Sequence, residues 1–207
     1  MSNRSRVVNI LAIGCGVLGA IALIAVVLVR FFVFQTYSMG SASMMPTLNT
    51  GDIVVVSLRA YVSDAPARGD IVVLKAHHDG ERWIKRVIGL PGDRVRMADG
   101  IPVINGKPVV RTRLTDFIDP SSSSPVPRYR ETDGRSYETL DLAPNSDFDD
   151  TALFVVPPDS FFVLGDNRDN SDDSRVSLGF VARSDITGKV VRSLLTRANG
   201  VALAPVE

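Results

Sequence analysis

The chain has 207 residues, of which 45% are hydrophobic, and its 23 Lys and Arg balance its 23 Asp and Glu. This length allows one ordinary domain, or a membrane anchor followed by a domain large enough to bury a core. Arg4, Arg6 and Arg30 are the only charged residues among the first 30, and subtracting them leaves 20 basic against 23 acidic residues, which gives no support to a nucleic-acid partner.

A long apolar segment from Val7 to Val29 follows the first two arginines. It contains no charge and only Asn9 is clearly polar, and as a helix it would be about 35 Å long, enough to cross a bilayer. Cys15, the only cysteine of the chain, lies inside it. The rest of the chain therefore has no intramolecular disulfide and no nucleophilic or zinc-binding cysteine.

The charges at the two ends of this segment indicate its orientation. Arg4 and Arg6 precede it, whereas Arg30 is followed by no basic residue before Arg59, and positive charge favours the cytoplasmic side. A cleaved secretory signal is the alternative, although its apolar region would be unusually long and the small residues at 40–42 lie well beyond it. We therefore predict a cytoplasmic N-terminus, a single transmembrane helix and an extracytoplasmic domain, at residues 1–6, 7–29 and 30–207, respectively.

Short β-branched runs bounded by Gly, Pro and Asp turns dominate the chain after residue 50. Such runs predict strands, at residues 53–56, 71–74, 83–88, 94–97, 153–156, 161–164 and 187–195. Asn105-Gly106, in the middle of residues 101–110, is the strongest hairpin signal in the chain. The predicted fold class is therefore mainly β.

Residues 111–150 differ in amino-acid composition from the rest of this domain. Three prolines and a run of four serines are followed by an acidic stretch that reaches Asp150, and apolar residues are few. A stretch of this composition has little with which to build a core. We expect an inserted or partly mobile excursion.

Several kinds of catalytic site have no support in the sequence. The only histidines, His77 and His78, are adjacent in a loop-like segment, and we expect them to be solvated rather than catalytic or metal-binding. Neither Gly-x-Ser-x-Gly nor Ser-x-x-Lys occurs, so the signatures of α/β-hydrolases and β-lactamases are missing. A catalytic serine would need a base other than histidine.

An Asp-rich loop at residues 165–175 suggests calcium at first sight. An EF-hand requires oxygen ligands at positions 1, 3 and 5, Gly at position 6 and Glu at position 12. With Asp166 as position 1, position 3 is Arg168, position 6 is Ser171 and position 12 is Ser177. The pattern does not match, and we predict no metal.

Three segments follow the predicted anchor in a characteristic order: residues 41–48 (SASMMPTL), 83–93 (WIKRVIGLPGD) and 165–175 (GDNRDNSDDSR). Together they resemble the signature boxes of bacterial type I signal peptidases, which are serine proteases with a Ser-Lys dyad. The resemblance covers the anchor and most of residues 34–195, and it weakens in the excursion. It implies a β-rich catalytic domain of coiled antiparallel sheets.

The resemblance implies that Ser43 is the nucleophile and that Lys85 is its general base. Lysine accepts a proton only when neutral, so its free pKa near 10.4 must fall by roughly three units. Strand alternation puts Trp83 and Val87 on the same face as Lys85, where they would exclude water from its amine, and directs Arg86 to the opposite face.

The same resemblance implies supporting roles for other residues. Ser41 would donate its hydroxyl to the oxyanion beside the backbone N–H of Ser43, and Ser171 would orient Lys85 by a hydrogen bond. Two structural ion pairs would hold the Asp-rich loop, Arg86 with Asp166 and Asp173 with Arg175.

The chain departs from the family pattern just before the nucleophile. Residues 36–43 contain no proline, and this departure concerns the local geometry of Ser41. A second Ser-Met pair, Ser38-Met39, is followed by Gly-Ser rather than Met-Pro, so we do not expect Ser38 to be the nucleophile.

The implied activity is endopeptidase cleavage of signal peptides from exported preproteins, at the outer face of the cytoplasmic membrane. The expected partners are preproteins and the lipid bilayer, and no metal or organic cofactor is expected. Two alternatives stay open: a specialised Ser-Lys peptidase of the conjugation-associated or self-cleaving repressor type, and a non-catalytic membrane-anchored β-domain that binds peptides or calcium.

Overall fold

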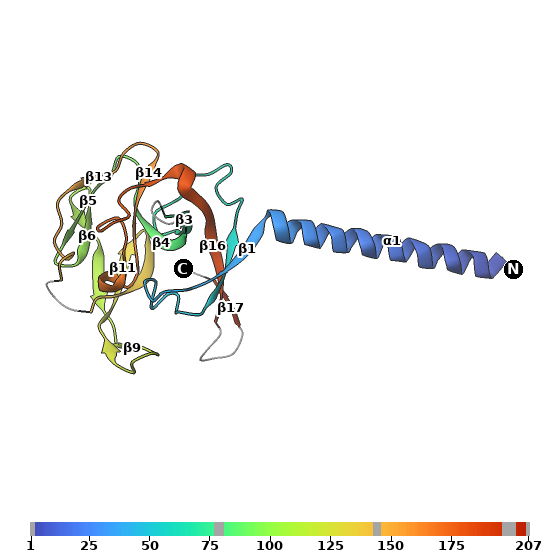
Figure 1. Cartoon of the computed structure of the whole chain (residues 1–207), viewed down its shortest axis with the longest axis horizontal. Coiled ribbons are helices and arrows are strands. Elements are labelled where there is room, and N and C mark those ends of the chain that lie inside the picture. Colours follow the sequence, from blue (N-terminus) through green and yellow to red (C-terminus); the bar gives the residue numbers. More distant parts are fainter. Residues whose placement is uncertain (1–2, 77–80, 143–145, 196–201, 206–207) are drawn as a thin grey trace.

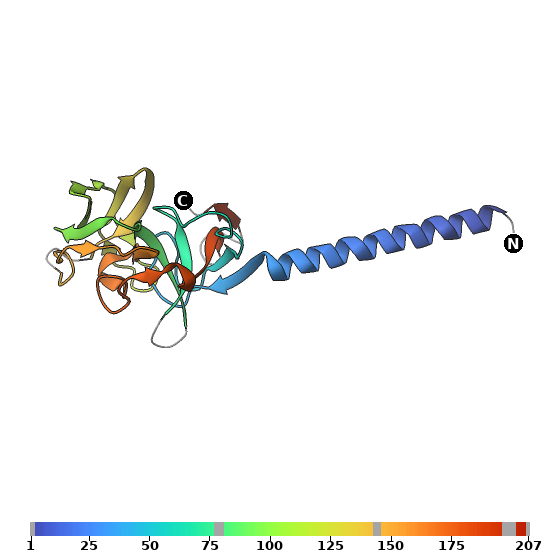
Figure 2. The same ribbon diagram turned by 90° about the horizontal axis from the view of Figure 1, so that it is seen from above.

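The structure of the chain is a computed structural model, and it describes residues 3–76, 81–142, 146–195 and 202–205 (Figure 1). One long helix, α1 (Asn3–Phe32), projects from a β-rich body, and a view turned by 90° shows the same separation (Figure 2). Among the residues searched, which are those that the structure describes, no helix meets the length and hydropathy of a membrane span. His77 and His78 lie outside the described residues.

The largest sheet has eight strands in the order β1-β2-β16-β3-β4-β14-β15, with β17 paired to β16. Its neighbouring strands are all antiparallel, and the sheet curls on itself. The prediction of a mainly β domain is thereby confirmed. The strands are Phe34–Ser38 (β1), Ile53–Ser57 (β2), Ile71–Lys75 (β3), Arg82–Gly89 (β4), Ser160–Leu164 (β14), Val181–Ala182 (β15), Ile186–Leu195 (β16) and Ala202–Pro205 (β17).

A second sheet is built from hairpins and has the order β13-β5-β6-β7. The predicted two-residue turn is present between β6 and β7, where Asn105 and Gly106 have φ values of 52° and 81°. Positive φ at both positions is what a type I′ hairpin turn requires, and Asn-Gly supplies it at low cost. The strands are Arg94–Ala98 (β5), Ile101–Ile104 (β6), Lys107–Pro108 (β7) and Phe154–Val155 (β13).

The described part of residues 111–150 forms two small sheets of its own, β12-β11-β8 and β10-β9. These strands could not be predicted from the sequence, because they lack the alternation of apolar and polar residues. Two of their fully buried positions, in β11 and β12, are the polar residues Glu131 and Thr139. The strands are Val110–Arg113 (β8), Phe117–Ile118 (β9), Pro125–Val126 (β10), Arg128–Asp133 (β11) and Arg135–Leu140 (β12). Two 3₁₀ turns, η1 (Arg168–Asn170) and η2 (Arg183–Asp185), complete the fold.

The core lies on both faces of the curled sheet, because strand alternation sends neighbouring residues to opposite sides. Ile71 and Val73 of β3 pack in one cluster, whereas Val72 and Leu74 pack in another. Met44 is fully buried in the first cluster. The residue after the predicted nucleophile therefore fixes that segment to the main sheet.

Candidate active site

Ser43 and Lys85 meet where the segment that follows β1 crosses β4. Lys85 Nζ donates a hydrogen bond to Ser43 Oγ at 3.0 Å, and the two residues are only 4% and 7% exposed. The ring of Trp83 lies 5.5 Å from Lys85 Nζ, and Val87 is fully buried in the same cluster as Trp83. The alternation of β4 thus places the ring of Trp83 beside the lysine amine.

The environment of Lys85 favours its neutral form. Burial lowers the pKa of Lys85 from 10.5 to about 8, although the carboxylates of Asp173, Asp172 and Asp166 oppose this change. A general base works best when its pKa lies near the operating pH. Burial by the protein's own residues therefore brings Lys85 close to the range that proton abstraction from Ser43 requires.

Ser41 lies beside the nucleophile on the open side of the site. Its side chain is exposed, and its Oγ is 3.1 Å from Ser43 Oγ. Both serines line a cleft of about 640 Å³ together with Ser38, Trp83 and Lys85. A hydroxyl at this position is within reach of a group that reacts with Ser43.

The hydrogen bond predicted between Ser171 and Lys85 is not formed. Within the described residues Ser171 Oγ is buried without a hydrogen-bond partner, although both residues line the cleft. Close packing explains its position, since a Cβ on Gly165 would lie 2.2 Å from Ser171 Oγ and 2.6 Å from the carbonyl oxygen of Ser43. Ser171 therefore packs on the Gly165 backbone, and the lysine amine donates its hydrogen bond to Ser43 instead.

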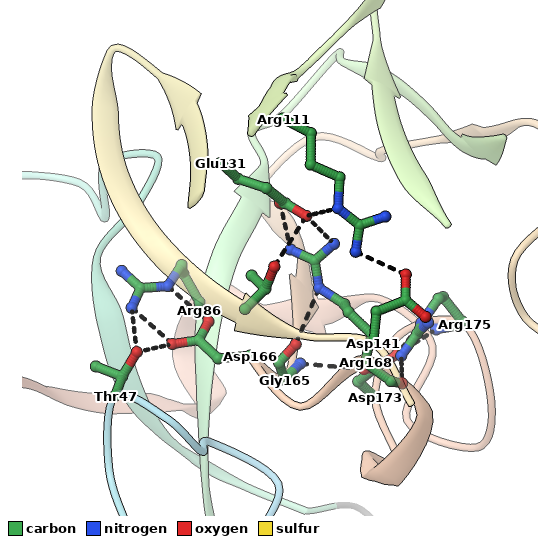
Figure 3. A network of polar contacts seen from close by, with 11 residues as sticks. Thr47, Arg86, Arg111, Glu131, Asp141, Gly165, Asp166, Arg168, Asp173 and Arg175 are labelled. Carbon is green, nitrogen blue, oxygen red and sulfur yellow. Dashed lines mark hydrogen bonds and ion pairs between the residues drawn. The ribbon is translucent and has the colours of Figure 1, made fainter. Parts of the chain in front are cut away.

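Two buried ion pairs hold the Asp-rich loop (Figure 3). Arg86 forms a bidentate pair with Asp166 at 2.7 and 2.8 Å, and both side chains are 1% exposed. Arg175 contacts Asp173 at 2.9 Å through two of its nitrogens. The loop is thus attached to β4, one residue away from Lys85.

Comparison with known proteins shows the family of the chain. Residues 13–195 match the family described as signal peptidase, peptidase S26. The chain belongs to this family. Signal peptidase I P of Bacillus subtilis subsp. natto is 38% identical over 169 residues, which cover 81% of this chain and 80% of that protein.

Other relatives match over similar lengths. Signal peptidase I of Rickettsia typhi is 35% identical over 175 residues, which cover 80% of this chain but only 65% of the longer relative. A crystal structure of a signal peptidase I from Enterococcus faecalis matches 61% of this chain and 97% of that chain, at 30% identity and a TM-score of 0.40.

A third buried ion pair of this family member was missed by sequence reasoning. Arg168 donates to both carboxylate oxygens of Glu131, at 2.8 and 2.6 Å, and the two side chains are 1% and 0% exposed (Figure 3). Thr139 and Arg111 contact the same carboxylate. The two partners come from the Asp-rich loop and from the excursion, and no local signal in either segment indicates the pairing.

Asn167 also escaped notice in the sequence, because its neighbours in the Asp-rich loop are charged. It is buried, its side-chain Nδ2 donates to the Ala42 carbonyl at 3.1 Å, and its backbone N–H donates to the Ser43 carbonyl at 3.0 Å. A parallel bridge pairs it with Leu140. Asn167 therefore joins the Asp-rich loop directly to the nucleophile segment.

Among the described residues, one group of carboxylates is close enough together to hold a metal ion. Asp141, Asp149 and Asp169 each offer an oxygen within 4.8 Å of the others. Protein donors already contact this group, since Arg111 donates to Asp141 at 2.6 Å and the Leu142 N–H donates to Asp169 at 2.7 Å. Hydrogen bonds to these carboxylates therefore connect the excursion to the Asp-rich loop.

Proposed function

We propose that this chain is a membrane-bound serine endopeptidase that cleaves N-terminal signal peptides from exported preproteins, with Ser43 as nucleophile and Lys85 as general base. The observation that carries the proposal is the 3.0 Å contact between Lys85 Nζ and Ser43 Oγ in a buried setting that lowers the lysine pKa to about 8. Membership of the signal peptidase family supports the substrate class. The proposed reaction uses the side chains and backbone of the site and one water molecule.

Each chemical step has a residue within reach. Lys85 takes the proton of Ser43 while Ser43 Oγ attacks the scissile carbonyl, and the carbonyl electron pair moves onto its oxygen. The Ser43 N–H and the Ser41 hydroxyl would stabilise that oxyanion. The protonated Lys85 returns its proton to the leaving amine, which gives an acyl-enzyme on Ser43. Lys85 then activates water to release the signal peptide.

The substrate would bind as an extended chain beside strand edges. β1 pairs with β2 alone and so forms an edge of the main sheet, and the residues that follow it line the cleft opposite the first half of β4. An extended peptide can add a strand at such an edge, with alternate side chains in pockets. Small residues at positions −3 and −1 of the cleavage site would fill the pockets beside Ser43.

The N-terminal helix would serve as the membrane anchor. The apolar stretch from residue 7 to residue 29 lies inside α1, and its large side chains between Ile13 and Val29 are 44–67% exposed. Apolar side chains in such numbers are stable in lipid rather than in water. The basic residues before the helix favour a cytoplasmic N-terminus and a catalytic domain on the outer face.

Substitution of the dyad tests the reaction. In detergent, Ser43→Ala and Lys85→Ala should each lower cleavage of a preprotein by at least about 10³-fold, because the two side chains act as a unit. Ser38→Ala should retain turnover, since this exposed serine lies in β1 outside the dyad. Parental cleavage by both dyad variants would contradict the mechanism, and loss with Ser38→Ala alone would identify a different nucleophile.

A further inference from the structure

Asn167 holds the two peptide units on either side of Ser43. Its Nδ2 donates to the carbonyl of Ala42 at 3.1 Å, and its backbone N–H donates to the carbonyl of Ser43 at 3.0 Å. Asn167 is 4% exposed, so these bonds are shielded from water. Asn167 thus holds the segment that carries the nucleophile from behind, together with buried Met44 and with the Met45 N–H, which also donates to the Ala42 carbonyl at 3.1 Å.

The bond to Ala42 also determines where the Ser43 N–H points. The Ala42 carbonyl and the Ser43 N–H belong to one planar trans peptide unit, in which they face opposite directions. Ser41 and Ser43 line the cleft, whereas Ala42 packs behind it against Met45. Holding the Ala42 carbonyl on the Asn167 side therefore directs the Ser43 N–H away from Asn167. Within the described residues this N–H donates to no protein acceptor.

The orientation of the Asn167 amide follows from the same contacts. Its Oδ1 is buried and has no hydrogen-bond partner among the described residues, whereas its Nδ2 faces the Ala42 carbonyl. A flipped amide would place two acceptor oxygens against each other, which costs free energy in a buried site. The donor orientation is therefore the favourable one.

The residues before and after Asn167 prevent it from moving. Asp166 is paired with Arg86 and Arg168 is paired with Glu131, and all four side chains are at most 1% exposed (Figure 3). In addition, the Leu140 N–H donates to the carbonyl of Asp166 at 2.9 Å. Two buried charge pairs thus clamp the backbone from which the Asn167 amide extends.

We propose that Asn167 is a positioning residue that aims the oxyanion-binding N–H of Ser43 by holding the Ala42 carbonyl. This inference rests on the proposed function, because it assigns the Ser43 N–H to the oxyanion. Asn167 is not among the residues that line the cleft, and its side chain acts through the 42–43 peptide unit.

Replacement of Asn167 by alanine removes the side-chain bond to the Ala42 carbonyl, which keeps its bond from the Met45 N–H, and leaves the backbone bond to Ser43 in place. Removal of one oxyanion donor in a serine protease costs about 10²–10³ in kcat, and a misaimed donor should cost somewhat less. We expect Asn167→Ala to lower kcat by roughly 10 to 100-fold with a KM close to the parental value. The substitution is neutral, so the pH midpoint of cleavage should stay unchanged.

A pair of inhibitors separates oxyanion aiming from a general structural role. When Ser43 Oγ adds to the carbonyl carbon of a peptide aldehyde with Ala at −3 and −1, its proton passes to Lys85 and the carbonyl electron pair moves onto oxygen, which gives an oxyanion. The matching peptide alcohol forms no such bond. With the full chain in detergent, Asn167→Ala should weaken the aldehyde by the same factor as kcat/KM and leave the affinity of the alcohol unchanged. Equal weakening of both inhibitors, or unchanged aldehyde binding, would overturn the proposal.

Two further measurements keep the test decisive. Asn167→Asp retains the shape of the side chain but turns an acceptor toward Ala42, so it should cleave no faster than Asn167→Ala. If both variants unfold, exchange of the Asn167 side-chain amide protons in the parent chain answers the question: slow exchange supports the bond to Ala42, and exchange at the rate of a free amide contradicts it. A parent chain that fails to cleave preproteins refutes the proposed function, whereas parental kcat in Asn167→Ala refutes this inference alone.

Discussion

Lys85 shows how one side chain can be made reactive by its place in a strand. Burial lowers its pKa from 10.5 to about 8, which is a cost of about 3 kcal/mol to the folded chain at neutral pH. Because the folded pKa lies below the unfolded one, this cost is present in full below pH 8 and is lost as the pH rises toward 10.5. The compensation is chemical, since a larger fraction of the amine is neutral and able to accept the proton of Ser43.

The pH dependence of cleavage follows from this pKa. Only neutral Lys85 is a base, so the single-turnover rate should rise with pH, reach half its maximum near pH 8 and level off about one unit higher. Asp172→Asn should shift the midpoint to lower pH, because the carboxylate of Asp172 raises the lysine pKa. A rate that is flat below pH 10 and rises only above it would count against Lys85 as a base with a lowered pKa.

At the scale of elements, the hairpin of β11 and β12 is attached to the Asp-rich loop by a buried ion pair. Glu131 of β11 pairs with Arg168, and the guanidinium of Arg86 lies 4.3 Å from the ring of Tyr137 in β12. At its tip, Arg135 contacts Asp70 at 2.7 Å. The hairpin therefore braces the loop that carries Asn167.

Breaking the buried pair should destabilise the whole domain. Glu131→Gln leaves the charge of Arg168 buried without its counter-ion, which costs about 3–5 kcal/mol. Glu138→Gln is the matched control in the same hairpin, because its pairs with Arg128 and Arg130 are partly exposed and worth at most about 1 kcal/mol. Urea unfolding in detergent measures both, and equal free energies of unfolding for the two variants would contradict the role of the buried pair.

At the scale of the whole molecule, one long helix projects from one β-rich body (Figure 1). Between Ile13 and Val29 the helix exposes large apolar side chains, whereas the main sheet buries its own on both faces. In the proposed arrangement the bilayer covers the helix, and the body works just outside the membrane, where signal peptides emerge.

The single cysteine reports on this arrangement. In intact membranes Cys15 should resist a water-soluble maleimide, because the proposed bilayer surrounds it, and it should react after denaturation in detergent. A chain with Cys15→Ala and Ser122→Cys carries its thiol on an exposed turn of the catalytic body and should be labelled from outside intact cells. Labelling of Cys15 in intact membranes would contradict the anchor, and labelling of Ser122→Cys only after lysis would contradict the orientation.

Much of the fold could be read from short stretches of sequence. The Asn105-Gly106 turn and five strands of the main sheet lie where β-branched runs and turn residues place them, namely β2, β3, β4, β14 and β16, whereas β1, β15 and β17 were not predicted. These features depend on interactions within a few residues, which any local segment contains. The juxtaposition of Ser43 and Lys85 was expected only through the resemblance of their motifs to those of a known family.

Other features depend on residues that are distant in sequence, and only the tertiary structure decided them. The strands of the excursion escaped prediction because Glu131 and Thr139 occupy buried positions that a pattern assigns to apolar residues, and their partner Arg168 lies 37 positions from Glu131. Ser171 Oγ is buried close to Gly165 and has no hydrogen-bond partner among the described residues. The strands that follow a β-branched pattern could be predicted from the sequence alone, because that pattern is a local property. The buried charges and the hold of Asn167 on Ala42 arise only when distant segments meet in a space without water.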